Sequence, residues 1–214
     1  MNLHPKRRLA AWIGGVVACI VLLGAGIAYI VIGFSGRDEV KHTVSRELIV
    51  GTPDMTPGGI KAAIAEAGLK NVQDVPTCSV ANVTVTDGTK AKCFASYMRI
   101  HALESSGGLT YAQMGRFQLA SDPSNPKGTS DEKLAAKDDK GKPIANGPRN
   151  TWVTETALTT GLNMAFFAEQ VSLFAIVVGF LMLVIGIGLG VLTIVVFGWT
   201  PWREEAAAGP SAAT

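Results

Sequence analysis

Two long stretches without a charged side chain constrain this chain more than any other feature. Between Arg8 and Arg37 the sequence reads LAAWIGGVVACIVLLGAGIAYIVIGFSG, and between Glu169 and Arg203 it reads QVSLFAIVVGFLMLVIGIGLGVLTIVVFGWTPW. Each exceeds the roughly 20 apolar residues that a helix needs to cross a bilayer core. The alternatives are a signal peptide for the first stretch and a buried core helix for the second. Both stretches are too long to favour these alternatives, so we predict two transmembrane helices.

Basic residues next to these stretches predict the topology. Lys6, Arg7 and Arg8 precede the first stretch, and Arg203 follows the second. Because Lys and Arg are enriched on the cytoplasmic side of spans, both termini are expected in the cytoplasm of a multi-pass plasma-membrane protein. The predicted order is a cytoplasmic basic tail (1–8), transmembrane helix 1 (9–35), an extracytoplasmic domain (36–168), transmembrane helix 2 (169–200) and a cytoplasmic tail (201–214).

The charge balance excludes one class of partner. The whole chain carries a formal charge of +2, the N-terminal tail holds three basic residues, and the C-terminal tail is slightly acidic. The central segment is therefore about neutral, whereas a nucleic-acid surface shows clustered Lys and Arg. We expect membrane lipid and another membrane protein or a second copy of the chain as partners, and no nucleic acid.

Cysteine usage agrees with an exterior location for the central segment. Cys78 and Cys93 both lie in it, and a pair in an oxidising compartment is most simply a disulfide. A two-thiolate metal site is the alternative, but the only external histidines are His42 and His101. Cys19, in the first span, needs no role beyond that of a small apolar side chain. We expect a disulfide, no metal and no cofactor.

The external segment predicts a small, mostly helical or α+β domain. A helix is expected after Thr56, with Thr56 as N-cap, Pro57 at the first helical position and Gly68 as the stop. The stretch CSVANVTVTDGTKAKCF predicts a strand and a turn, with Asp87-Gly88 as a hairpin signal.

Three further parts of this segment have their own patterns. Residues 37–50 fit either a continuation of the first helix or a strand. Residues 121–150 are rich in Pro, Gly, Ser, Asn, Lys and Asp, which predicts an exposed, mobile loop. Residues 152–167 favour a helical extension of the second span outside the membrane.

The candidate ligand site lies in FASYMRIHALESSGGLTYAQM. We expect a helix of about a dozen residues up to Glu104, ended by glycines that permit a left-handed C-cap. Tyr97, His101 and Glu104 then share a helical face, with Tyr111 after the turn. A metal or proton site is one interpretation, and a packed helix with a surface histidine is the other. No nucleophile elbow, zinc-protease motif, phosphate loop or dinucleotide fingerprint occurs, so no catalytic residue is assigned and no enzyme is expected.

Small residues in the spans predict helix packing. In lipid, where no hydrophobic effect drives association, small residues let helix backbones approach closely. Either the two spans pair with each other, or they dock onto another membrane protein. Neither span contains an ionisable residue, which argues against a proton or ion pathway. The candidate packing residues are Gly24, Ala28, Gly179, Gly186 and Gly190.

Two features resemble actinobacterial two-pass membrane proteins of unknown function. They are the motif from Gly107 to Ala112, within HALESSGGLTYAQM, and the long helix that follows 121–150. Those proteins carry a similar external Ser-Gly-Gly-x-Thr-Tyr-Ala motif before their second span. The resemblance implies the same architecture, with 121–150 as an enlarged loop. Some members carry an automatic label of ring-opening dioxygenase, but an iron site of that kind needs two histidines and a carboxylate. Here it would require both His42 and His101, because His4 is expected on the other side of the membrane.

These patterns favour a non-catalytic accessory or scaffold subunit of a membrane or envelope complex. The alternative is an extracytoplasmic sensor or small-ligand binding module, in which Tyr97, His101 and Tyr111 line a pocket. A metal-dependent enzyme is the third interpretation.

Overall fold

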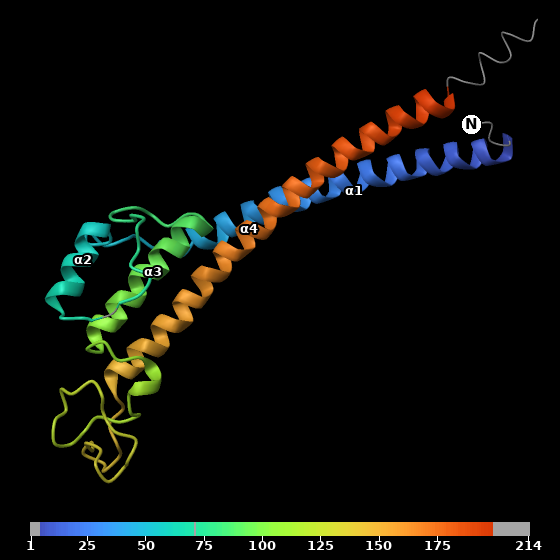
Figure 1. The fold of residues 1–214 in the computed structure, drawn as a ribbon. Helices are drawn as coiled ribbons and strands as arrows, with labels where there is room; N and C mark the ends of the chain where they lie inside the picture. Colours follow the sequence, from blue (N-terminus) through green and yellow to red (C-terminus); the bar gives the residue numbers. More distant parts are fainter. Residues whose placement is uncertain (1–4, 71, 199–214) are drawn as a thin grey trace, which may run out of the picture. The chain divides into compact units, whose positions relative to one another are not determined.

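Four α-helices and their connections make up the described part of the chain (Figure 1). The computed structural model describes residues 5–70 and 72–198, and side chains from residue 9 to residue 196. The predicted Lys and Arg anchors at 6–8, and the C-terminal tail with Arg203, lie outside the described side chains. The elements are α1 (Pro5–Ser45), α2 (Pro57–Glu66), α3 (Gly88–Ser105), a 3₁₀ turn η1 (Tyr111–Gln113), α4 (Gly147–Thr193) and a π-helical turn η2 (Ile194–Gly198).

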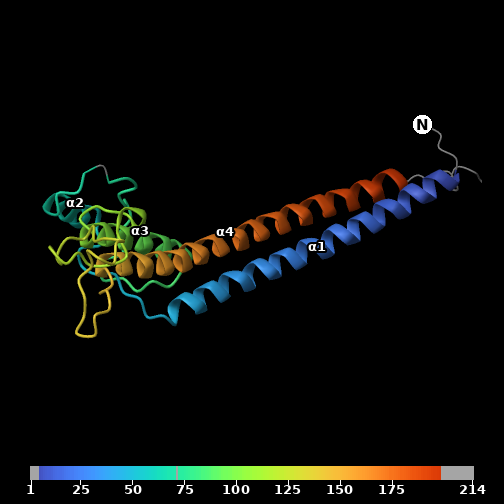
Figure 2. The same ribbon diagram turned by 90° about the horizontal axis from the view of Figure 1, so that it is seen from below.

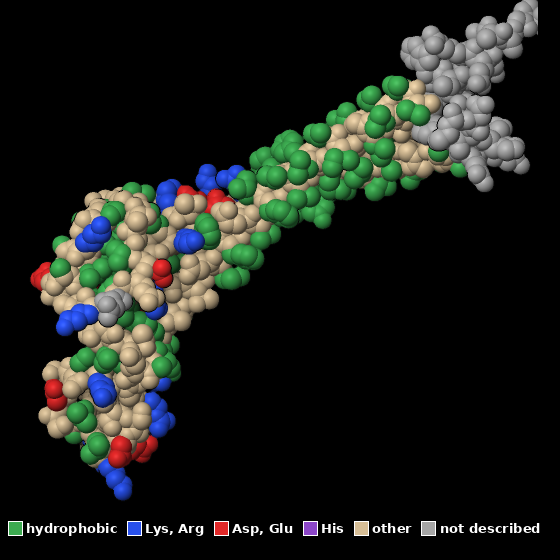
Figure 3. Space-filling model, in the orientation of Figure 1, with side chains coloured by type: hydrophobic (Ala, Val, Ile, Leu, Met, Phe, Trp, Pro, Cys, Tyr) green, Lys and Arg blue, Asp and Glu red, His purple; other side chains and the backbone are tan. Residues whose placement is uncertain are grey.

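The chain divides into two compact units. One contains the chain up to Arg37 and from Gln170 onward, and the other runs from Asp38 to Glu169. We call them the helix pair and the domain. Both α1 and α4 contain segments long and apolar enough to cross a membrane, within Leu9–Ser45 and Gly147–Val196. Figure 3 shows hydrophobic side chains covering the visible face of the helix pair, as expected for a surface that meets lipid rather than water.

The two helices of the pair run antiparallel (Figure 2). They pack through glycines. A Cβ placed on Gly26 would lie 2.9 Å from the carbonyl oxygen of Gly179, and one on Gly179 would lie 2.7 Å from the carbonyl oxygen of Gly26. Towards one end Gly33 meets Ile176, and towards the other Gly190 meets Cys19. The backbones approach so closely because no side chain separates them.

The face that α1 uses differs from the predicted one. Gly24 and Ala28 are exposed, and a Cβ on Gly24 would meet no atom within 4 Å. Gly26 and Gly33, seven residues apart, make the contact instead, and on α4 Gly179 and Gly186 repeat the same interval. A seven-residue interval keeps one face of each helix on the seam, which is the geometry of left-handed helix pairs. Gly24 and Ala28 therefore do not form the face that packs on α4, and packing through them against another membrane protein stays a prediction.

The domain is built around a core between α2 and α3. Tyr97 and Ile100 of α3 are buried against Ile60 of α2, and Leu162 of α4 joins the same cluster. Helix α2 begins as predicted: the Thr56 side chain accepts a hydrogen bond of 3.0 Å from the Gly59 amide, with Pro57 in the first turn.

One covalent bond holds the connection from α2 to α3, and contacts with α4 hold the start of α3. Cys78 and Cys93 form the predicted disulfide. At the start of α3, the Thr89 amide donates a 3.1 Å hydrogen bond to a carboxylate oxygen of Glu169, and a Cβ on Gly88 would lie 2.7 Å from the Cα of Phe166. Helix α3 therefore starts in direct contact with α4.

The predicted hairpin at Asp87-Gly88 is wrong. Asp87 is the N-cap of α3, and its carboxylate accepts a 2.8 Å hydrogen bond from the Lys90 amide. The segment before it forms isolated bridges, Val50 with Thr84 and Gly51 with Ala81, rather than a strand. Among the described residues the domain is helical with isolated bridges and no named strand, so the helical alternative holds over α+β. Residues 37–50 continue α1 to Ser45 and then turn.

The segment expected to be a mobile loop has a specific backbone course. Phe117 bridges to Thr129 and Ala145, and Leu119 bridges to Ala135. Asn146 is 1% exposed and its amide donates 3.0 Å hydrogen bonds to the carbonyls of Gly115 and Pro126. These contacts tie 121–150 to residues on both sides, and its last residues already belong to α4. The mobility expected for this segment stays a prediction.

Candidate functional site

His101 lies between two carboxylates in the domain. His101 on α3 places Nδ1 2.8 Å from a carboxylate oxygen of Glu104, one helical turn on. Its Nε2 lies 3.2 Å from a carboxylate oxygen of Asp54, in the loop before α2. A protonated imidazole can therefore donate to both acids at once and tie the Asp54 loop to α3.

Asp54 is the partner that the sequence analysis missed. A hydrogen bond from the Thr52 side chain lowers the pKa of Asp54, against the opposing effect of burial, and its own backbone amide and the charge of His101 lower it further. No sequence signal connects Asp54 to His101, because they are far apart in the chain and meet only when α2 packs on α3. Within the described residues no group of three or more His, Cys, Asp or Glu side chains is arranged to hold a metal ion.

The other two candidate ligand residues are engaged elsewhere. Tyr97 is fully buried, and its hydroxyl donates a 2.6 Å hydrogen bond to the carbonyl of Cys78. Burial raises the pKa of Tyr97, and the negative charge of Asp54 adds to the rise. Tyr111 lies under the guanidinium of Arg149, 3.9 Å from the ring centroid. The structure thus brings together His101 and Glu104, while Tyr97 fastens the disulfide loop and Tyr111 packs under Arg149.

The Gly-Gly-x-Thr-Tyr-Ala motif forms a turn. Gly107 and Gly108 have φ of 62° and 80°, the left-handed region predicted for them. The Gly108 amide donates 2.8 Å to the carbonyl of Leu103, which closes the end of α3. Thr110 then starts η1, and its amide donates 2.8 Å to the side chain of Gln113. These contacts account for the motif residues as parts of a helix end and the turn that follows.

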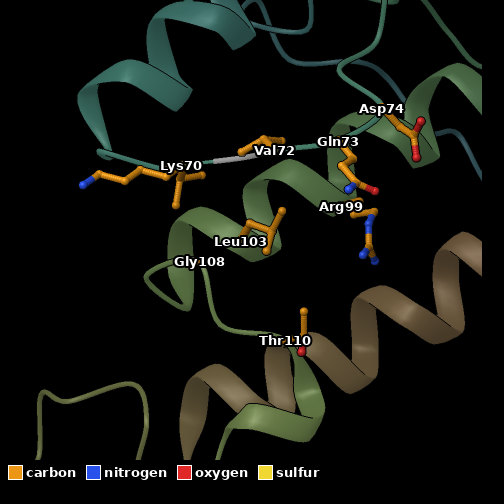
Figure 4. Close-up of a pocket in the computed structure, with 9 residues that line it drawn as sticks. Lys70, Val72, Gln73, Asp74, Arg99, Leu103, Gly108 and Thr110 are labelled. Atoms are coloured by element: carbon orange, nitrogen blue, oxygen red, sulfur yellow. The ribbon is translucent and has the colours of Figure 1, made fainter.

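A polar cavity of about 220 Å³ opens beside the end of α3 (Figure 4). Its lining includes Arg99, Gln73 and Thr110, with Leu103 among its apolar residues. In Figure 4 the Arg99 side chain extends toward the space above Thr110, whereas Lys70 extends away from it. The Arg99 guanidinium also lies 5.4 Å from the centroid of the Trp152 ring. Asp74 also lines the cavity, so its wall carries a carboxylate as well as the Arg99 guanidinium.

A larger cavity of about 420 Å³ is almost wholly apolar. Its lining comes from three elements: the end of α1 and the turn after it, Phe94 of α3, and one side of α4 around Leu158 and Leu162. We call it the apolar cavity. Neither cavity is lined by Tyr97, His101, Glu104 or Tyr111.

The outer face of α4 carries exposed apolar side chains within the domain. Val153, Met164 and Phe167 are 49%, 57% and 59% exposed. With Ala157 and Thr160, also exposed, they follow at intervals of four and three residues and so lie on one side of the helix. We call this set of five residues the α4 stripe. Side chains of this size, gathered on one face, are typical of a surface that another protein covers.

Comparisons with models of protein families, with curated proteins and with solved structures find no match to this chain. The resemblance to actinobacterial two-pass membrane proteins accordingly stays a hypothesis.

Proposed function

We propose that this protein is a non-catalytic, two-pass membrane protein that serves as an accessory or scaffold subunit of a membrane or envelope complex. In this proposal both termini are cytoplasmic and the domain is extracytoplasmic. Two observations support the anchoring: α1 and α4 are long and apolar enough to cross a bilayer, and within the described residues they pair through glycines without an Asp, Glu, Lys or Arg side chain at the seam.

The observation that carries the proposed role is the α4 stripe. Val153, Met164 and Phe167 lie on the domain part of α4 and are about half exposed. The opposite side of the same helix is already used: Trp152 and Leu162 are buried against the rest of the domain. A 4-3-4-3 spacing of exposed residues, apolar at every position but Thr160, suits a second helix, because knobs at these positions fit between the side chains of a facing helix. The occupant we infer is a helix of another membrane protein.

The test is extraction of the full-length protein from its native membrane in mild detergent, followed by affinity purification and mass spectrometry. Met164→Asp puts a charge at the centre of the α4 stripe, and Asn163→Asp puts the same charge on an exposed neighbour that points elsewhere around the helix. We expect a stoichiometric partner with the wild type and with Asn163→Asp. With Met164→Asp its recovery falls by about tenfold, which corresponds to a loss of about 1.4 kcal/mol of binding.

Three outcomes would count against this proposal. A homogeneous wild-type monomer with nothing bound would contradict the accessory role and favour the alternative, a ligand-binding module. The residues of that module would be Arg99 and Thr110 in the polar cavity, not Tyr97 and Tyr111. Equal recovery from both variants would show that the partner binds away from the α4 stripe. A dimer of the chain that Met164→Asp disrupts would identify the occupant as a second copy.

A further inference from the structure

The apolar cavity is a space that water fills poorly. Its floor is made by Val44, Phe94 and Leu162, which are 5–7% exposed. Leu158 and Ala165 of α4 add further apolar surface to its wall. Water against this lining finds few hydrogen-bond partners, because an ordered water needs two or more polar groups. A volume of about 420 Å³ is in the size range of sites for small organic ligands.

The polar groups at the cavity restrict what enters it. Glu47 is the one ionisable side chain among the described residues that line it, and it is paired with Arg46 at 3.5 Å in an exposed position. Thr43 is the one hydroxyl residue of the lining, and its hydroxyl donates a 3.2 Å hydrogen bond to a carboxylate oxygen of Glu39. The apolar lining disfavours a fatty acid anion or a phosphate group inside the cavity, because a charge there would lose its hydration without a partner. The occupant is therefore an uncharged chain, whose polar end stays outside.

The bilayer that α1 and α4 are proposed to cross is a source of such an occupant. Two walls of the cavity belong to α1 and α4, the helices that contain the candidate membrane spans. Ala165 lies five residues before Gln170, and the helix-pair part of α4 begins at Gln170. At about 1.5 Å of rise per residue, the wall starts within about 8 Å of the apolar segment along the helix axis. A lipid chain in the adjoining leaflet is thus within reach.

We propose that the apolar cavity binds one acyl chain of a bilayer lipid. This proposal rests on the membrane anchoring proposed above, but not on the α4 stripe or its partner. Burial of the acyl chain removes the apolar surface of Leu158, which is 39% exposed, from water. The bound lipid then bridges the end of α1 and α4 within the domain.

Gly161 provides a direct test of this site. It lines the cavity, and a Cβ there would meet no atom within 4 Å, so Gly161→Leu fills the cavity without displacing the fold. Gly147→Leu is the matched control, because Gly147 is also on α4, also faces open space, and does not line the cavity. Leu158→Trp is a second filling variant, at a residue of the same wall that is 39% exposed and lies outside the α4 stripe.

The experiment uses full-length protein in nanodiscs of phosphatidylcholine that contain a small fraction of the same lipid with a diazirine on one acyl chain. After illumination, peptide mass spectrometry locates the adducts. We expect adducts on the peptide with Leu158 and Leu162 as well as on the apolar helix pair. In Gly161→Leu and Leu158→Trp the cavity adducts fall by about tenfold, while those on the helix pair persist. In Gly147→Leu both persist.

The outcomes separate this proposal from the proposed function. Wild-type adducts on the helix pair but not on the cavity peptide would overturn lipid binding and leave the anchoring intact. Cavity adducts that survive both filling variants would also overturn it, since the label would then come from the outer surface. Absence of adducts from the helix pair as well would overturn the membrane anchoring itself.

Discussion

The helix pair and the domain are held together in different ways. In the helix pair, Gly26 and Gly179 place the two backbones in contact, and large side chains such as Phe174 and Ile185 are exposed. In the domain, large side chains such as Tyr97 and Ile100 are buried, and a disulfide fastens the connection between α2 and α3. One unit buries backbone against backbone, and the other buries side chains.

The difference follows from the surroundings that each unit is proposed to have. In water, burial of Tyr97 or Ile100 removes apolar surface from the solvent, which is the main favourable term in folding. In lipid that term disappears, because acyl chains solvate leucine as well as another leucine does. Close packing is then the remaining source of attraction, and glycine allows the closest packing of two helices. The two units should therefore respond to different substitutions.

The largest effect is expected from the disulfide, and only in the domain. The bond joins residues 15 positions apart, and its loss in Cys78→Ala/Cys93→Ala should lower the free energy of unfolding of the domain by about 3 kcal/mol, because the unfolded chain gains freedom. Hydrogen exchange of the α2 and α3 amides measures this loss. Dithiothreitol should reproduce it in the wild type and change nothing in the double variant. A uniform rise in exchange that includes α1 near Gly26 would show that the two units are not independent.

The next largest effect is expected in the helix pair. Gly179→Leu drives a side chain into the carbonyl of Gly26 and should destabilise the pair by about 1–3 kcal/mol, whereas Gly188→Leu faces open space and should be near neutral. Cys19 supplies the reporter. Its sulfur lies 3.0 Å from the position of a Cβ on Gly190, so Gly190→Cys brings a second thiol within bonding reach.

Three proteins that all carry Gly190→Cys are compared: one with no other change, one with Gly188→Leu and one with Gly179→Leu. Mild oxidation should crosslink α1 to α4 in the first two. Crosslinking should be much slower in Gly179→Leu. Peptide mass spectrometry after proteolysis measures the crosslinked fraction. Equal rates in all three proteins would refute the glycine seam, and hydrogen exchange at α2 and α3 should be unchanged throughout.

The same contrast explains how much of the fold the sequence predicts. The two apolar helices, the cap at Thr56 and the disulfide each depend on a local signal or a simple count, and the structure has all three. The face of α1 is not predictable in this way. An almost wholly apolar helix has no polar side to identify its packed side, so Gly24 and Gly26 are equivalent candidates until the partner helix is placed.

The errors in the domain have other physical origins. Asp followed by Gly fits both a hairpin turn and a helix N-terminus, and the contact of Gly88 with α4 favours the second. The backbone course of 121–146 depends on contacts with few residues, among them Phe117 and the buried Asn146. The overall composition, dominated by Pro, Gly and charged residues, does not reveal these contacts. Of the candidate ligand residues, His101 and Glu104 share a face as the helical spacing predicts. Asp54 reaches them only through tertiary packing.

The smallest effect is expected at Asp87, again only in the domain. Its carboxylate accepts a hydrogen bond from the Lys90 amide and pairs with the Lys90 ammonium, both at 2.8 Å. Partial burial acts to raise the pKa of Asp87, but the hydrogen bonds and charge of Lys90, with the Thr86 hydroxyl, hold it below the ordinary value of 3.8. Asp87→Ala removes the cap and should cost about 1 kcal/mol at neutral pH.

The pH dependence separates the cap from the charge. Because folding lowers the pKa of Asp87, its charge stabilises the domain above the ordinary value of 3.8, and this contribution is lost as the pH falls through the lower folded value. Asp87→Asn retains a capping oxygen without the charge, so the wild type should exceed it at neutral pH by at most about 1 kcal/mol. That difference should disappear in acid, while Asp87→Ala stays less stable than Asp87→Asn throughout. A wild-type advantage over Asp87→Asn that persists unchanged below the folded pKa would show that the charge of Asp87 does not stabilise α3.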